Sequence, residues 1–202
     1  MKKENIIYAA IGIILLLLVV SQLPIIPQFS IVLTEEEKEE NLYEYYDEGD
    51  LGELSFYSGA IVGNVFTIGT VGPNENFVIN SIKIKLKKQG SPGTIYLNIY
   101  KSGVDGKPTG EPLTSGSIQG NDLSETEFEE LTIDLEKAIL NKDEKYVFFL
   151  SITGGDENNM VWTRAFNDNL YPGGDAILKV EEGWQYYDYF DVLFKIYGTG
   201  PV

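Results

Sequence analysis

Apolar and polar residues alternate along most of the chain, and this period of two constrains the fold more than any other feature. In INSIKIKLKK (residues 79–88), the side chains of Ile82, Ile84 and Leu86 fall on one face and lysines fall on the other. Successive side chains of a strand point to opposite faces of a sheet, so the segment predicts a half-buried strand. No segment after Asn64 shows a sustained helical period. We therefore expect an all-β domain.

Further runs and turns extend this prediction. In TIYLNIY (residues 94–100), isoleucine and leucine alternate with outward-facing Tyr96, Asn98 and Tyr100. The run KYVFFLSIT (residues 145–153) is apolar on both faces, which predicts a central strand. The segment at residues 101–116 is rich in glycine and proline, so we expect a long exposed loop there. About eight or nine strands between short turns predict a two-layer β-sandwich of the jelly-roll type.

The N-terminal segment, residues 1–34, has the pattern of an export signal or a membrane anchor. Lys2 and Lys3 precede an uninterrupted apolar run at residues 6–20. This order is typical of both kinds of segment, and a hydrophobic helix could continue to Pro24. The spacing of small residues matches a cleavage site only loosely, and on the length of the apolar stretch we favour an uncleaved anchor over a cleaved signal. We expect an extracellular location at the cell surface, membrane-anchored or secreted.

The end of this segment, FSIVLT (residues 29–34), consists of uncharged residues with high β propensity. Such a segment can add to the open edge of a sheet. Phe29, Ile31 and Leu33 would then form an assembly strand that inserts into a neighbouring copy. Head-to-tail insertion makes fibres, so a filament or lattice subunit is one alternative function.

Residues 35–53 contain ten acidic side chains and one lysine. Like charges in series repel one another and keep a chain extended. We interpret residues 35–54 as an acidic linker that holds the β domain, residues 55–202, away from the membrane. The spacing of the acidic residues does not fit a twelve-residue calcium loop.

Composition excludes several classes of function. The formal net charge is −16 and Arg164 is the single arginine, so we expect no nucleic-acid partner. The chain has no cysteine and no histidine, which excludes thiolate nucleophiles, Ser-His-Asp relays, and haem or iron–sulfur ligation. Carboxylate pairs can support glycoside hydrolysis, but nothing in the sequence marks a cleft. We expect no enzymatic activity.

The order of turns and core aromatics resembles a known class of domain. It is carried by GSPGTIYLNIY, GKPTGEPL, KYVFFLSI, an inner tryptophan, YPGGDA, GW and DVLFKIYG. Over residues 60–198 this order is similar to extracellular jelly-roll domains of prokaryotic surface proteins, which include carbohydrate-binding-module-like and envelope-anchor-associated domains. The resemblance implies a non-catalytic structural or adhesive component of the cell envelope, and a glycan-binding module is a further alternative.

Glycan binding would need flat aromatic rings beside planar hydrogen-bonding groups. Our candidate ligand-binding residues are Trp162, Arg164, Asp168 and Tyr171. A wider set of candidates comprises Asn167, Trp184, Tyr186, Tyr187 and Tyr189. Arg164 would either stack on Trp162 or pair with Asp168 or Asp191. In the alternative interpretation, Trp162 fills the core and Arg164 lies at its rim.

Two loops offer oxygen ligands. Asp156 and Asn158 in GGDENN, with Asp168 in NDN, are candidate metal ligands. Jelly rolls of the resembled type often hold a structural calcium ion, and we expect no other cofactor. The alternative is that both segments are ordinary polar loops, because neighbouring side chains in an extended segment point opposite ways and neither supplies a full shell alone.

Overall fold

The computed structural model describes residues 40–49, 52–167, 171–181, 183–187 and 190–202. They belong to one unit of the chain, Lys38–Val202. This part of the chain contains thirteen strands and one 3-10 turn, η1 (Gly120–Asp122), so the all-β prediction is confirmed. Among these residues, no helix is long and apolar enough to span a membrane. The predicted N-terminal helix and the predicted assembly strand of Phe29, Ile31 and Leu33 lie outside the described residues.

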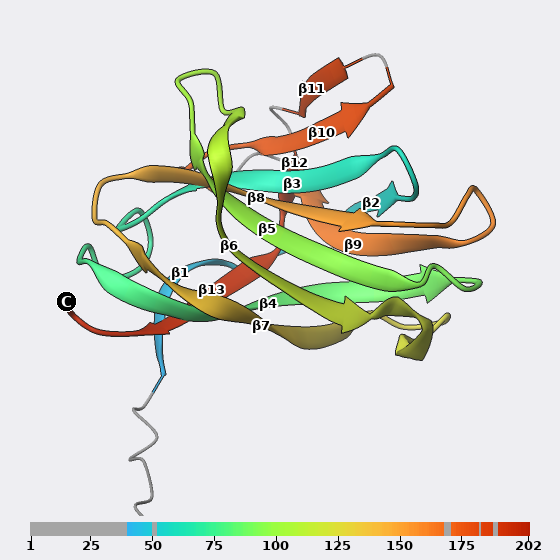
Figure 1. Cartoon of the computed structure of the whole chain (residues 1–202), viewed down its shortest axis with the longest axis horizontal. Coiled ribbons are helices and arrows are strands. Elements are labelled where there is room, and N and C mark those ends of the chain that lie inside the picture. The colour runs from blue at the N-terminus through green and yellow to red at the C-terminus, as the bar shows by residue number, and fades with distance from the viewer. Residues whose placement is uncertain (1–39, 50–51, 168–170, 182, 188–189) are drawn as a thin grey trace, which may run out of the picture. The chain divides into compact units, whose positions relative to one another are not determined.

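The strands form two antiparallel sheets in a sandwich-like arrangement (Figure 1). Sheet A comprises β1 (Asn41–Tyr46), β2 (Gly52–Phe56), β4 (Phe77–Gln89), β7 (Glu129–Leu140), β9 (Met160–Asn167), β12 (Phe190–Val192) and β13 (Phe194–Thr199). Sheet B comprises β3 (Ile61–Thr67), β5 (Thr94–Ser102), β6 (Pro108–Gln119), β8 (Lys145–Ile152), β10 (Ala176–Val180) and β11 (Gly183–Tyr187).

Strand pairing sets which side chains share a face. Sheet B runs in the order β11-β10-β3-β8-β5-β6, so the apolar run in β8 is central, as predicted. In sheet A, β2 pairs with β9, β9 with β4, and β4 with β7. The last strands add to this set, because β12 pairs with β9 and β13 pairs with β4. β1 then pairs with β13.

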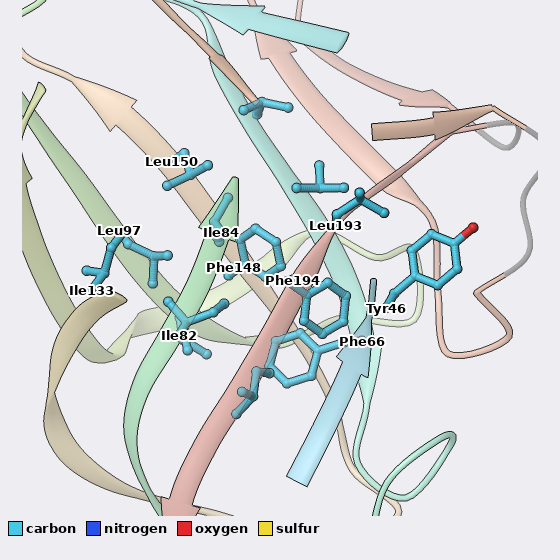
Figure 2. Packing of buried hydrophobic residues seen from close by; sticks show 14 of the residues in the cluster. Tyr46, Phe66, Ile82, Ile84, Leu97, Ile133, Phe148, Leu150, Leu193 and Phe194 are labelled. Carbon is cyan, nitrogen blue, oxygen red and sulfur yellow. The ribbon is translucent and has the colours of Figure 1, made fainter. Parts of the chain in front are cut away.

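The main core lies between the sheets and follows the predicted alternation. Ile82 and Ile84 of β4 pack there with Phe148 of β8 (Figure 2). Phe66 and Phe194 complete an aromatic cluster, and the ring centroids of Phe148 and Phe194 lie 5.4 Å apart. Burial of these side chains removes large apolar areas from water and is the main stabilising contribution to the fold.

The predicted linker, residues 35–54, differs from the structure at its C-terminal end. Residues 41–46 form β1 and residues 52–54 begin β2. Tyr43 is 1% exposed, and its ring stacks on Phe77 with centroids 3.8 Å apart. The many acidic residues suggested a solvated segment, so the sequence did not reveal this strand. In the structure, Glu44 is buried.

The predicted loop at residues 101–116 is wrong over most of its length. A turn follows β5, and β6 then begins at Pro108 and pairs with β5. β6 is the last strand of its sheet, where a proline without an N–H group is tolerated. Gly110 has a φ of 71°, a conformation that glycine adopts without strain, in the region where the pairing shifts register.

Candidate functional site

Trp162 and Arg164, two of the predicted ligand-binding residues, lie together on the outer face of sheet A. Their neighbours Val161, Thr163 and Ala165 are fully buried, so the alternating pattern directs Trp162 and Arg164 away from the core. The interpretation that Trp162 fills the core is therefore wrong. Both side chains are half-buried.

Two cationic side chains, Lys87 and Arg164, lie in the same cluster as Trp162. Lys87 lies directly opposite Trp162 on β4, and its ammonium is 5.7 Å from the indole and 4.6 Å from the ring of Phe128. The Arg164 guanidinium stacks on Phe128 at 4.1 Å, rather than on Trp162. Glu53 accepts hydrogen bonds from Lys87 (2.9 Å) and Arg164 (3.3 Å). Charges and rings thus satisfy one another in this cluster.

Tyr171 lies elsewhere, in the core, and is 1% exposed. Its ring packs edge-on against Phe194, with centroids 5.4 Å apart. A ligand at the surface cannot stack on this ring, so the ligand-binding assignment of Tyr171 is wrong. The segment YPGGD gave no sign of this, because an aromatic residue beside proline and glycine is equally typical of an exposed loop.

Two buried carboxyl groups flank Tyr171. Glu44 accepts hydrogen bonds from the Tyr171 hydroxyl (3.2 Å) and from the N–H groups of Gly69, Thr70 and Val71 (2.9–3.0 Å). Asp191 accepts from Tyr171 N–H and from the Asn64 amide, both at 3.3 Å. Each carboxyl is 0% exposed.

The electrostatics of these two carboxyls follow from their burial. Desolvation raises the pKa of Asp191 from 3.8 to about 7, against hydrogen bonds from Asn64 and Tyr171 that lower it. Burial also raises the pKa of Glu44, although its backbone and Tyr171 hydrogen bonds act in the opposite direction. Through their hydrogen bonds, Glu44 links β1 to residues 69–71 and Asp191 links β12 to Asn64 of β3. Asp191 is therefore not the partner of Arg164.

The predicted metal ligands are brought together only in part. Asp156 and Asn158 lie in the turn between β8 and β9, where Asp156 Oδ1 accepts hydrogen bonds from Asn158 N–H (2.8 Å) and the Asn159 amide (2.9 Å). Asp168 lies outside the described residues. Within the part that the structure describes, no group of three or more acidic side chains could hold a metal ion. Calcium binding stays a prediction.

A second set of aromatic residues lies on the outer face of sheet B. β5 places Tyr96, Asn98 and Tyr100 there, as predicted, and Tyr96 is 37% exposed. Registered neighbours on β6 add the hydroxyl groups of Ser115 and Ser117. Hydroxyl and amide groups beside exposed tyrosine rings are the chemistry that sugar recognition needs.

The same face continues toward β11 through Phe149. The ring of Phe149 lies 6.0 Å from Tyr100 and 5.1 Å from Trp184 between ring centroids. Gly63 lies beside Phe149 in the adjacent strand, and a Cβ there would come within 2.7 Å of the Phe149 ring. The absence of a side chain at Gly63 thus leaves the space that Phe149 occupies. Lys179 Nζ lies 5.6 Å from the Trp184 ring.

The turn between β5 and β6 limits this face at one side and projects from the sheet at the top of Figure 1. Tyr186, which is 44% exposed, donates a hydrogen bond from its hydroxyl to the carbonyl oxygen of Asp105 in this turn. A Cβ at Gly106 would lie within 3.3 Å of both Val65 and the Tyr186 ring. The turn therefore covers the apolar side chains at this end and leaves Tyr96 and Asn98 outside the covered area.

We call the surface formed by Tyr96, Asn98, Tyr100 and Trp184 the aromatic face. Phe149 is 5% exposed and belongs to a second buried cluster, against which Tyr100 and Trp184 pack. Trp184 belonged to the wider set of sequence candidates, whereas Phe149 was missed. The sequence does not indicate that β8 pairs with β5 or that β11 lies two strands beyond β3. The proximity of the Tyr100, Phe149 and Trp184 rings therefore could not be predicted. Asn167 has no described side chain, and Tyr189 lies outside the described residues.

No family model matches the sequence, and no curated protein matches it. Solved structures give distant likenesses. One holds the cysteine protease and lectin-like domains of Cwp84, a surface-layer-associated protein of Clostridium difficile, with 14% identity and a TM-score of 0.46 over 80% of this chain. A family two carbohydrate esterase from Cellvibrio japonicus is 10% identical, with a TM-score of 0.31 over 78% of this chain.

The carbohydrate-binding module CBM36, solved in complex with calcium and xylotriose, is 12% identical with a TM-score of 0.32. The match covers 62% of this chain and 95% of the module. This chain spans only 36% of the Cwp84 chain and 33% of the esterase chain. Identities and TM-scores this low establish neither kinship nor a shared activity.

Proposed function

We propose that this chain is a non-catalytic, extracellular surface component that acts in adhesion by binding glycans on its aromatic face. The observation that carries the proposal is the exposure of Tyr96 beside Asn98 on an open sheet face. The C–H face of a pyranose ring stacks on aromatic rings, while amides and hydroxyls bond its hydroxyl groups. The aromatic face offers both kinds of group.

The dimensions of the aromatic face favour an extended glycan over a single sugar. Tyr96 and Trp184 lie on β5 and β11, which are four strand spacings apart in sheet B. The Trp184 ring nevertheless reaches back to Phe149, so the rings of Tyr100 and Trp184 lie at most about 11 Å apart. Tyr96 lies four residues from Tyr100 on β5, about 13 Å along the strand, so a chain of several sugar residues that follows β5 would contact Tyr96 at one end and these rings at the other.

The strand pairing supports a jelly roll as the finer description of the fold. β2 to β9 divide between the sheets, four to each, with the orders β2-β9-β4-β7 and β3-β8-β5-β6. These orders match the two four-stranded sheets of a double Greek key, to which β1 and β10 to β13 would add. The extracellular location rests on the N-terminal sequence, where Lys2 and Lys3 precede the apolar run.

Affinity electrophoresis tests this function. The purified chain would be run in native gels that contain hydroxyethyl cellulose, arabinoxylan or pullulan. We expect at least one of these neutral polymers to retard it, and Tyr96→Ala to weaken the interaction by about five- to tenfold because one stacking contact is lost. Because the proposed function is non-catalytic, incubation with these polymers should form no new reducing ends. The matched control is Tyr197→Ala, which truncates a half-buried tyrosine of the other sheet.

Two results would contradict the proposal. One is migration unaffected by every neutral polymer tested. The other is retardation that Tyr96→Ala leaves unchanged while Tyr197→Ala abolishes it. Unfolding curves of both variants separate a loss of binding from a loss of structure.

A further inference from the structure

The outer face of sheet A carries a concentration of positive charge that the glycan-binding proposal does not use. The chain as a whole has a formal net charge of −16, with 15 lysines and arginines. Three of the lysines lie on the outer face of β4 at alternate positions, Lys83, Lys85 and Lys87. Alternate residues of a strand lie about 6.6 Å apart, so these lysines form a regular row. Arg164 and Lys195 border the row from β9 and β13.

Two of these cations face one another across a strand pair. Lys195 of β13 is registered directly opposite Lys83 of β4. Like charges directly opposite on neighbouring strands destabilise a sheet. Lys195 is neutralised locally, because Glu130 lies 2.9 Å and Asp47 3.3 Å from its ammonium.

Lys83 and Lys85 form no ion pair of their own, although Glu130 of β7 is registered directly opposite Lys85. Within the described residues, no carboxylate lies in ion-pair contact with either ammonium, and Lys83 instead lies 4.7 Å from the ring centroid of Tyr197. The other acidic side chain at the row, Glu53, already bridges Lys87 and Arg164. Glu130 is shared with Lys195, so the surface retains part of the positive charge of Lys83 and Lys85.

We propose that this lysine row is a second binding surface, for a polysaccharide that carries repeated carboxylate groups, such as a polyuronate. Lys83 and Lys85 would contact carboxylates, and a sugar ring would stack on Tyr45 at the β1–β13 side of the row. Tyr45 is registered opposite Lys195 on the same face. A sugar acid fits better than a phosphate polymer, because Tyr45 offers a ring on which a sugar can stack and a polyphosphate has no ring to use it.

The net negative charge of the chain does not prevent such binding at ordinary ionic strength. The Debye length is about 8 Å at 0.15 M salt, so acidic groups on distant surfaces are largely screened. Between these lysines the surface is hollowed by about 10 Å³ over Leu193 and Phe194, and the carboxylates of Asp47 and Glu130 also line this hollow. This space holds about one water molecule, so the polymer would lie across the row instead of entering a pocket.

The test compares two double variants that remove the same charge. The purified chain would be run through gels containing polygalacturonate, long-chain polyphosphate or hydroxyethyl cellulose, at about 20 mM and 150 mM salt. We expect retardation by polygalacturonate that weakens with salt. Lys83→Gln/Lys85→Gln should reduce the affinity at least tenfold. Lys142→Gln/Lys145→Gln, at exposed positions near the start of β8, should leave it within about twofold of the original protein.

Fluorescence gives a second readout that does not depend on the lysine variants. The only tryptophans are Trp162 and Trp184. In Trp184→Phe, the remaining indole lies beside Lys87 at the row, and its emission should change when polygalacturonate is added. Tyr96→Ala should keep this response, which separates the lysine row from the aromatic face.

Three outcomes would overturn the proposal. The first is migration in polygalacturonate that equals migration in the plain gel. The second is an equal loss in both lysine double variants, which would show a general charge effect. The third is retention by polyphosphate as strong as that by polygalacturonate, which would exclude recognition of a sugar. None of these results bears on the binding of neutral polymers at Tyr96, which is measured separately.

Discussion

Asp191 gives a stability prediction whose sign and size follow from its burial. Its carboxyl is 0% exposed, and its pKa is raised from 3.8 to about 7. One pKa unit corresponds to about 1.36 kcal/mol, so ionising this group costs the folded protein about 4 kcal/mol relative to the unfolded chain. A carboxyl with a raised pKa stabilises the fold below pH 3.8. That stability is lost as the pH rises toward 7, and the loss is complete above it.

The informative perturbation is Asp191→Asn. Asparagine cannot ionise, and it keeps one of the two acceptors that bond Asn64 and Tyr171. Loss of the other acceptor costs about 1–2 kcal/mol at every pH. At about pH 5 the ionisation cost of Asp191 is already about 1–2 kcal/mol, which offsets the lost acceptor, so we expect the variant and the original protein to be about equally stable there. About 3 kcal/mol more of the ionisation cost develops between pH 5 and pH 8.5, so we expect the variant to be the more stable protein at about pH 8.5.

Urea unfolding followed by tryptophan fluorescence measures both proteins across this range, above the pI of about 4.3. The nearby Asp175 and Glu44 remain in both proteins, so the difference between their unfolding free energies isolates position 191. A difference that stays constant within about 0.5 kcal/mol from pH 5 to 8.5 would refute the reasoning, as would a difference of opposite slope.

Three further predictions concern stability. Glu44→Ala should lower the unfolding free energy by about 3 kcal/mol or more, because three backbone N–H groups and the buried Tyr171 hydroxyl lose their acceptor; equilibrium unfolding in urea measures this, and a loss below 1 kcal/mol would contradict it. Phe148→Ala should cost about 3–5 kcal/mol and Trp162→Ala clearly less, so equal costs in thermal unfolding would place Trp162 in the core. Gly63→Ala should lower the melting temperature sharply, since its Cβ would lie 2.0 Å from the carbonyl oxygen of Phe148; an unchanged melting temperature would disprove that close approach.

The faces of individual strands could be predicted from the sequence because burial in a sheet has a period of two. Ile82, Ile84 and Leu86 are buried as the alternation required, and Tyr96 faces outward. The class of fold followed from the same signal. Strand order did not, because it depends on contacts between residues far apart in the sequence. The meeting of Phe149 with Trp184 is one such contact.

Charge was the main source of error. A run of acidic residues usually indicates a solvated segment. Glu44 departs from that rule, because three consecutive backbone N–H groups and a tyrosine hydroxyl surround its carboxylate. Tyr171 was misassigned for a related reason, since the carboxyls that it bonds lie 127 and 20 residues away in the sequence. Nothing local to either residue indicates its partner.

The two tryptophans allow the most direct test of glycan binding on the aromatic face. Trp162→Phe leaves Trp184 as the only indole, and Trp184→Phe leaves Trp162. Each variant would be titrated with the neutral polymer that retards the original protein most, and its emission recorded. We predict a saturable change from Trp184 and none from Trp162. A response from Trp162 alone, or from neither tryptophan, would contradict the account.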